Sequence, residues 1–208
     1  MEMLNKNMKK KLANTTTFIR VIMIFISIAL LIHNNIALRK LGFIILLFTF
    51  LLDGLDGFFA RIFNTANNTG ALIDTLGDRI TENVMLVFLA CKNLIPLAIP
   101  LIFISRSFFA DFIRFLVFSK NIGTFAINKS KFGFYIVASK TSRITYLLLK
   151  YIVFLSGSLI IIYQDRKIVD KFSLSLLLFY AVIILTITNI LRFLALVFDS
   201  RKIIKEIF

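Results

Sequence analysis

The chain has few cysteines and few charges. Its single cysteine, Cys91, excludes an internal disulfide framework and any zinc site built on two cysteines. Charged residues make up 17% of the 208 positions, with 11 acidic against 25 basic side chains, while 59% of the residues are hydrophobic. A soluble domain has about 25% charged and roughly 45–50% apolar residues. This composition excludes an ordinary soluble enzyme and also a disordered basic tail.

Long apolar runs take up most of the sequence. A helix needs about 20 mostly apolar residues to span a bilayer, and six segments approach that length. They are Phe18–Ile32, Leu41–Ala60, Ala71–Ala90, Leu94–Phe118, Ile144–Tyr163 and Phe172–Phe198. Open strands would leave backbone groups unpaired in lipid, so these segments must be helices. We expect an all-α integral membrane protein with six transmembrane helices, forming a single domain over residues 1–208.

The net charge of +14 indicates an anionic lipid surface as partner and no nucleic acid, because no soluble scaffold remains to present it. Lysine and arginine are more frequent in segments 1–17, 61–69, 119–143 and 199–208 than in the opposite loops, which predicts that both termini are cytoplasmic. Segment 1–17 has apolar residues among its lysines. We expect it to form a short helix on the membrane surface before the first span.

Four acidic residues lie within the apolar segments, where charged side chains are costly: Asp53, Asp56, Asp74 and Asp78. Their spacings of three and four residues put each pair on one helix face. The connecting loop 62–69 is short, so the pairs can converge at the cytoplasmic end. Such a cluster needs neutralising cations, and carboxylate oxygens suit Mg²⁺, Mn²⁺ or Ca²⁺ better than zinc. The alternative is a set of salt bridges, but four acids exceed what Arg61 and Arg79 could pair.

Small residues accompany the acids at Gly54, Gly57, Ala60 and Gly70. They would let a ligand approach the backbone closely. Taken alone, the glycines are more typical of close packing between membrane helices.

Residues 53–78 read DGLDGFFARIFNTANNTGALIDTLGD. This stretch resembles the signature of the CDP-alcohol phosphatidyltransferases, D-x-x-D-G-x-x-A-R, eight residues, then G-x-x-x-D-x-x-x-D. Every defined position is filled. The six-helix layout and the chain length extend the resemblance more loosely over the whole chain.

The resemblance implies transfer of a phosphatidyl group from a CDP-linked lipid to an alcohol, with release of CMP. Asp53, Asp56 and Asp74 would hold two divalent cations, Mg²⁺ or Mn²⁺. Asp78 would also face the metals and is the expected catalytic base, although a role as a metal ligand alone stays open. Contacts to the CDP-lipid would come from four residues: Gly57, Ala60, Arg61 and Gly70.

Basic residues later in the chain suggest a site for a phosphorylated acceptor. Arg106 and Arg114 are eight residues apart, and Lys140 and Arg143 follow. The pattern is similar to the branch of the family that makes phosphatidylglycerophosphate, so glycerol 3-phosphate is the expected acceptor of CDP-diacylglycerol. The branch's Gly-Lys-x-Lys-Thr is incomplete here, which leaves inositol phosphate, serine and phosphatidylglycerol open. Structural alternatives are snorkelling, pairing with Asp111, or ordinary positive-inside anchoring.

The stretch from Asn14 to Arg20 reads NTTTFIR and is similar to the family's N-x-x-T-x-x-R entry to the first helix. Its structural alternative is a helix cap followed by a snorkelling arginine. In the second half, Thr188, Asn189 and Arg192 could bond between helices without a catalytic role.

A cation- or proton-coupled transporter is the alternative from another class, since intramembrane acids often mark ion paths. Transporters commonly show repeated halves, and none is visible here. We therefore expect a metal-dependent enzyme in a membrane, the bacterial inner membrane, with its active site at the cytoplasmic face. The resemblance also implies that the protein can form a homodimer.

Overall fold

The computed structural model describes residues 2–62, 68–119, 130, 133–164 and 171–205. Side chains are described for 15–53, 73–113, 130, 133–137, 139–164 and 172–201. Within these ranges the long helices are α1 (Glu2–Ile32), α2 (Ile36–Ile62), α3 (Asn68–Cys91), α4 (Ala98–Ser119), α6 (Lys140–Ile162) and α7 (Lys171–Lys205). A short π-helical turn, η2 (Phe134–Ala138), precedes α6. Each of the six apolar segments expected from the sequence lies largely within one long helix, so the all-α prediction is confirmed for the described residues.

The first helix differs from the expected arrangement. Residues Glu2–Ile32 form one continuous helix, so the prediction of a separate short helix before the first span is wrong. The physical reason is visible in the sequence, since this stretch contains no proline or glycine to interrupt the helix. The polar run Asn14–Thr17 resembles a helix start but lies in the interior of α1.

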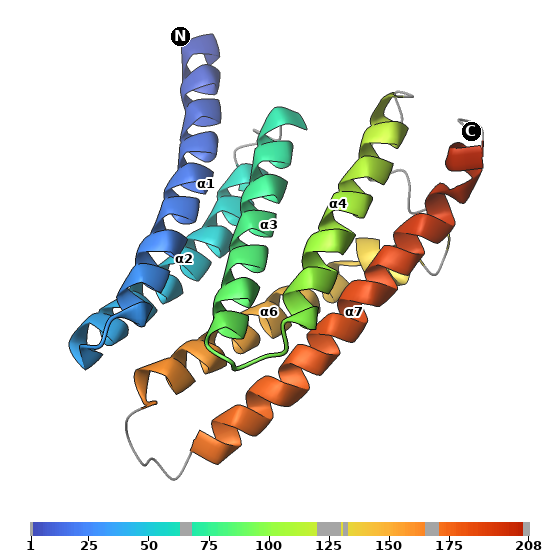
Figure 1. Cartoon of the computed structure of the whole chain (residues 1–208). Helices are drawn as coiled ribbons and strands as arrows, with labels where there is room; N and C mark the ends of the chain where they lie inside the picture. The colour runs from blue at the N-terminus through green and yellow to red at the C-terminus, as the bar shows by residue number, and fades with distance from the viewer. Residues whose placement is uncertain (1, 63–67, 120–129, 131–132, 165–170, 206–208) are drawn as a thin grey trace.

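The helices form a bundle in which α1 packs against both α2 and α3 (Figure 1). On the other side of the bundle, α4 and α6 both pack against α7, and α6 also contacts α2. The start of α1 and the end of α7 lie at the same end of the bundle (Figure 1). Helix α1 is therefore in contact with both helices that carry the acidic motif.

Glycines allow two of these close contacts. A Cβ atom at Gly42 of α2 would lie 2.8 Å from the backbone oxygen of Ser27 in α1. The Ser27 hydroxyl donates a 2.8 Å hydrogen bond to the Gly42 carbonyl, so the two helix backbones nearly touch. At Gly157 of α6 a Cβ atom would lie 2.5 Å from Leu89 of α3. Small residues at helix crossings are typical of membrane bundles.

The connection from α3 to α4 explains a difference in helix bounds. The fourth helix was expected from Leu94 but begins at Ala98. Asn93 adopts a left-handed conformation with φ 56°, and the Leu94 amide bonds back to the Leu89 carbonyl at 3.0 Å. This turn ends α3 and uses residues that hydropathy alone assigns to the next helix.

The distribution of side chains is inverted relative to a soluble protein. Charged side chains including Arg20, Arg39 and Lys150 are buried, whereas Phe108 and Phe172 are more than 70% exposed. Exposed apolar surface with charges inside is the pattern of a bundle surrounded by lipid. Among the described residues, three stretches are long and apolar enough to cross a membrane: Thr15–Ile32, Lys140–Ile162 and Phe172–Arg201. The protein is therefore an integral membrane protein.

Candidate active site

Three carboxylates meet where α2 and α3 approach each other. Asp53 comes from α2, and Asp74 and Asp78 lie one turn apart on α3. One oxygen from each can be chosen so that all three lie within 4.8 Å of one another. The prediction that acids from these two helices converge is confirmed for these three residues.

The donor set fits a hard divalent cation. The three side chains offer carboxylate oxygens alone, and this cluster contains no histidine or cysteine. Mg²⁺ and Mn²⁺ prefer oxygen ligands, whereas zinc sites usually include nitrogen or sulfur. Asp74 is exposed and the other two are half-buried, so a cation can reach them from solvent. The cluster can therefore hold a divalent cation at the edge of the bundle.

Among the described side chains, Arg20 of α1 forms ion pairs with all three acids of this cluster. Its Nη2 lies 2.9 Å from Oδ1 of Asp74 and 3.2 Å from Oδ1 of Asp78, and its Nη1 pairs with Oδ1 of Asp53. The side chain is 2% exposed. Because it is fully buried and ion-paired, the snorkelling interpretation of Arg20 is wrong.

Helix α6 adds two polar side chains to the same region. The Tyr151 hydroxyl donates a 2.6 Å hydrogen bond to Oδ2 of Asp53. Lys150 is buried and lines a small cavity together with Arg20, Asp53 and Asp78. Sequence reasoning missed both residues. The available signal was a lysine inside an apolar run, since a charge in a span is costly unless it has a function or a partner.

The remaining motif residues lie outside the described side chains. Asp56, Gly57, Ala60 and Arg61 belong to the last turns of α2, and Gly70 to the first turn of α3. Asp56 is three residues after Asp53, so the helix places its backbone on the same face.

A second polar group lies between α3, α4, α6 and α7. Arg79 of α3 donates a 2.7 Å hydrogen bond to the Ser107 carbonyl and forms an ion pair with Asp111, both on α4. Arg79 therefore points toward α4, which argues against the alternative that it pairs with the motif acids. One turn along α3, buried Glu82 accepts a 2.5 Å hydrogen bond from Tyr146 of α6.

Several arginines lie near this second polar group of Arg79, Asp111, Glu82 and Tyr146. The Arg192 guanidinium lies 4.7 Å from the centre of the Tyr146 ring, and its Nη1 is 3.4 Å from Ser142. It is close enough to Arg106 and Arg143 to interact with both electrostatically. The prediction of bonds between helices is confirmed for Arg192. It is wrong for Thr188, whose hydroxyl donates to carbonyls within α7, and the Asn189 amide has no partner among the described residues. The proximity of Arg192 to the candidate acceptor residues was missed, because Arg192 is far from them in sequence.

The four residues expected at the acceptor phosphate are placed unequally. Arg106 is half-buried, and its Nε has no hydrogen-bond partner in the described part of the chain. Arg143 is near Arg192, whereas Lys140 is exposed at the first turn of α6. The side chain of Arg114 in α4 is not among those described.

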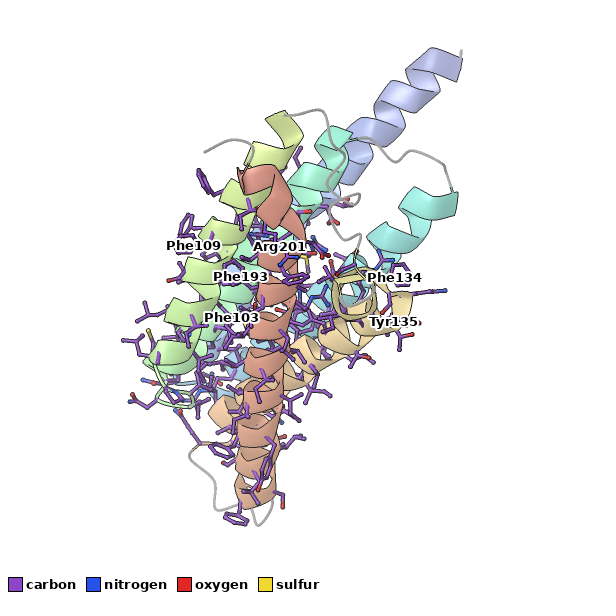
Figure 2. All side chains as sticks on the ribbon, turned by 90° about the vertical axis from the view of Figure 1, so that its right-hand side faces the viewer. Phe103, Phe109, Phe134, Tyr135, Phe193 and Arg201 are labelled. Atoms are coloured by element: carbon purple, nitrogen blue, oxygen red, sulfur yellow. The ribbon has the colours of Figure 1, made fainter. Side chains whose placement is uncertain are left out.

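A groove of about 350 Å³ runs beside Arg106 between α4 and α7. Phe109 of α4 and Phe193 of α7 form part of its wall, with ring centres 6.5 Å apart, and Figure 2 shows the two side by side. The walls of the groove are mostly apolar, and Arg106 adds a guanidinium group to them.

Comparison with known proteins agrees with the geometry. Residues 10–201 match the family model for CDP-alcohol phosphatidyltransferase. Two relatives are the CDP-diacylglycerol–glycerol-3-phosphate 3-phosphatidyltransferases of Rickettsia typhi (strain ATCC VR-144 / Wilmington) and Rickettsia prowazekii (strain Madrid E), each 28% identical over 105 residues. These matches cover 50% of this chain and 59% and 58% of the relatives, so the chain spans less than two thirds of either. No solved structure matches the chain. Because the family model covers most of its length, the chain belongs to the CDP-alcohol phosphatidyltransferase family.

Proposed function

We propose that this protein transfers the phosphatidyl group of CDP-diacylglycerol to glycerol 3-phosphate and releases CMP. The observation that carries the proposal is the meeting of Asp53, Asp74 and Asp78 inside a complete family signature. The two Rickettsia relatives bear the name of this activity, which supports this choice of acceptor.

The motif acids would bind the metal. Asp53, Asp56, Asp74 and Asp78 would hold two Mg²⁺ or Mn²⁺ ions, for which three of them offer converging oxygens. Paired cations stabilise negative charge on the attacking and leaving oxygens of a phosphoryl transfer. The chain's own part is to fix these oxygens. Tyr151 does so at Asp53, whose Oδ2 accepts a hydrogen bond from the Tyr151 hydroxyl.

The reaction is a displacement at phosphorus. The acceptor hydroxyl oxygen forms a bond to the phosphorus of the phosphatidyl group, and the bond between this phosphorus and the oxygen of CMP breaks. The hydroxyl proton passes to Asp78, the candidate base, whose carboxylate must lie within hydrogen-bond reach of the acceptor. The nucleotide would be held by Gly57, Ala60, Arg61 and Gly70.

The acceptor phosphate would bind the arginine group. Arg106 has a buried Nε without a hydrogen-bond partner among the described residues, and the charge of Arg192 interacts with those of Arg106 and Arg143. Guanidinium groups bind phosphate bidentately, which favours a phosphorylated acceptor over serine. Arg114 and Lys140 complete the proposed site. We add Arg192 to this set because its charge interacts with those of Arg106 and Arg143.

The test is CMP release by purified protein in detergent. Protein, CDP-diacylglycerol and Mg²⁺ are incubated with one acceptor at a time: glycerol 3-phosphate, inositol phosphate, serine or phosphatidylglycerol. Release with glycerol 3-phosphate alone supports the proposal, and EDTA should stop it until Mg²⁺ is restored. Release with another acceptor alone overturns the choice of acceptor but retains the class. No release by folded protein contradicts the enzyme and favours the cation-coupled transporter.

We further propose a place for the protein in the cell. Basic side chains are enriched in the segments nearest the acidic motif, which favours a cytoplasmic active site in a bacterial inner membrane. Cysteine labelling from each side tests the orientation. A cysteine introduced at Ser119, in a variant with Cys91 replaced by serine, should react from the cytoplasmic side. A homodimer is also proposed, and sedimentation in detergent tests it.

A further inference from the structure

The contacts of Arg20 with the acidic cluster are unusually complete. Its guanidinium reaches the Oδ1 atom of Asp53, Asp74 and Asp78, so one buried positive charge serves all three acids. Three carboxylates this close repel one another strongly, because Coulomb energy rises as the separation and the local dielectric constant fall. Arg20 reduces that repulsion from inside the bundle.

The packing of α1 on α3 places Arg20 there. Gly77 lies between Asp74 and Asp78 in sequence and is buried. A Cβ atom at Gly77 would be 2.5 Å from Cγ2 of Thr17 and 3.5 Å from Nη2 of Arg20. The missing side chain therefore lets α1 approach α3 at the level of the acids.

A second buried arginine, Arg39, lies near the start of α2, away from the acidic cluster. Arg39 of α2 is 3% exposed and bonds backbone carbonyls, with 2.7 Å to His33 and 3.3 Å to Ile161. Those contacts join helix ends. Arg20 instead contacts the carboxylates that the proposed function assigns to the metal.

We propose that Arg20 is a built-in counter-cation of the acidic cluster, with which a divalent cation competes for the carboxylates of Asp53, Asp74 and Asp78. The inference rests on the proposed function for the metal, but the neutralising role of Arg20 does not depend on it. Two cations that share the same anionic oxygens oppose each other's binding. Arg20 thereby stabilises the protein without metal and weakens metal binding, which keeps the site exchangeable.

The first experiment measures Mn²⁺ binding to the protein. Bound Mn²⁺ is detected as a decrease of the free Mn²⁺ signal in electron paramagnetic resonance. Arg20→Met removes the charge and keeps an unbranched chain, while Arg20→Lys keeps the charge. Arg20→Met should bind Mn²⁺ about tenfold more tightly than wild type, within the range typical of coupled sites. Arg20→Lys should stay near wild type. The matched control Arg39→Met should leave Mn²⁺ affinity unchanged.

The second experiment tests the charge interaction between Arg20 and the acids without any metal. Melting temperatures are measured in EDTA for wild type, Arg20→Met, Asp78→Asn and the double variant. Asp78→Asn should lower the melting temperature of wild type, because Arg20 loses a partner. In the Arg20→Met background the same change should raise it, because one of three mutually repelling charges is removed. If Arg20→Met does not fold, recovery of folded protein on adding Asp78→Asn is the expected result.

The outcomes separate the inference from the proposed function. Weaker Mn²⁺ binding by Arg20→Met, or Asp78→Asn lowering the melting temperature equally in both backgrounds, overturns the counter-cation role. If wild type binds no Mn²⁺ while the sign reversal is observed in EDTA, the metal assignment fails and the neutralising role of Arg20 stands.

Discussion

The phenol of Tyr151 donates a 2.6 Å hydrogen bond to Oδ2 of Asp53, and Arg20 pairs with the other oxygen of the same carboxylate. One acid of the cluster is thus held from α6 and from α1 at once. The Tyr151 ring also stacks on Phe50 with 4.3 Å between ring centres, which restricts where the hydroxyl can lie. Asp53 is oriented before any ligand arrives.

Replacing Tyr151 by phenylalanine isolates the contribution of this hydroxyl, because the stacking on Phe50 is retained. Loss of a hydrogen bond to a charged group should lower the free energy of unfolding by about 1.5–3 kcal/mol. CMP release should also need more Mg²⁺ for half-maximal rate. Tyr180→Phe is the control, since Tyr180 is 59% exposed, and it should change neither quantity. An unchanged Mg²⁺ requirement in Tyr151→Phe would show that the hydroxyl does not orient the metal ligands.

Neutralising a motif acid should abolish activity while the protein stays folded. Asp56→Asn keeps the size of the side chain but removes the negative charge that a divalent cation needs. CMP release should be lost, with the melting temperature in EDTA close to that of wild type. Asp111→Asn is the matched control, because Asp111 pairs with Arg79 outside the acidic cluster, and its activity should keep the Mg²⁺ dependence of wild type. Substantial transfer by Asp56→Asn would contradict the metal assignment.

The acidic cluster could be predicted because its geometry is local. Helix periodicity places Asp74 and Asp78 on one face, and the short connection after α2 brings Asp53 to the same end. The extent of the helices followed from hydropathy for a similar reason. The bounds that failed were those that hydropathy does not set: α1 starts at Glu2, before its apolar run, and the left-handed turn at Asn93 delays the start of α4.

The partners of the acids could not be predicted, because they come from helices distant in sequence. Tyr151 follows Asp53 by 98 residues, and Arg20 precedes Asp74 by 54. Which face of α1 or α6 turns toward the motif depends on close contacts such as Ser27 with Gly42, which hydropathy does not encode. The same limit hid the proximity of Arg192 to Arg106.

Removing the hydroxyl of Tyr146 should destabilise the second polar group. Glu82 is 6% exposed and accepts a hydrogen bond from this hydroxyl, so Tyr146→Phe leaves a buried carboxylate without that donor. The expected loss is about 1–3 kcal/mol in the free energy of unfolding, the range for a buried group left unsatisfied. Tyr135→Phe, at a 70% exposed tyrosine, should have no effect. If Glu82→Gln were added, the combined loss should be smaller than the sum, since the two residues interact directly.

Loss of the Arg106 guanidinium should act on the acceptor more than on the lipid. Its buried Nε has no partner among the described residues, and the charges of Arg106 and Arg192 are close enough to interact, as a shared anion would require. Arg106→Ala should raise the KM for glycerol 3-phosphate about tenfold or more, and the KM for CDP-diacylglycerol much less. Arg201→Ala is the control, because Arg201 stacks on Phe198 near the end of α7. Equal increases in both KM values would show that Arg106 supports the bundle and does not bind the acceptor phosphate.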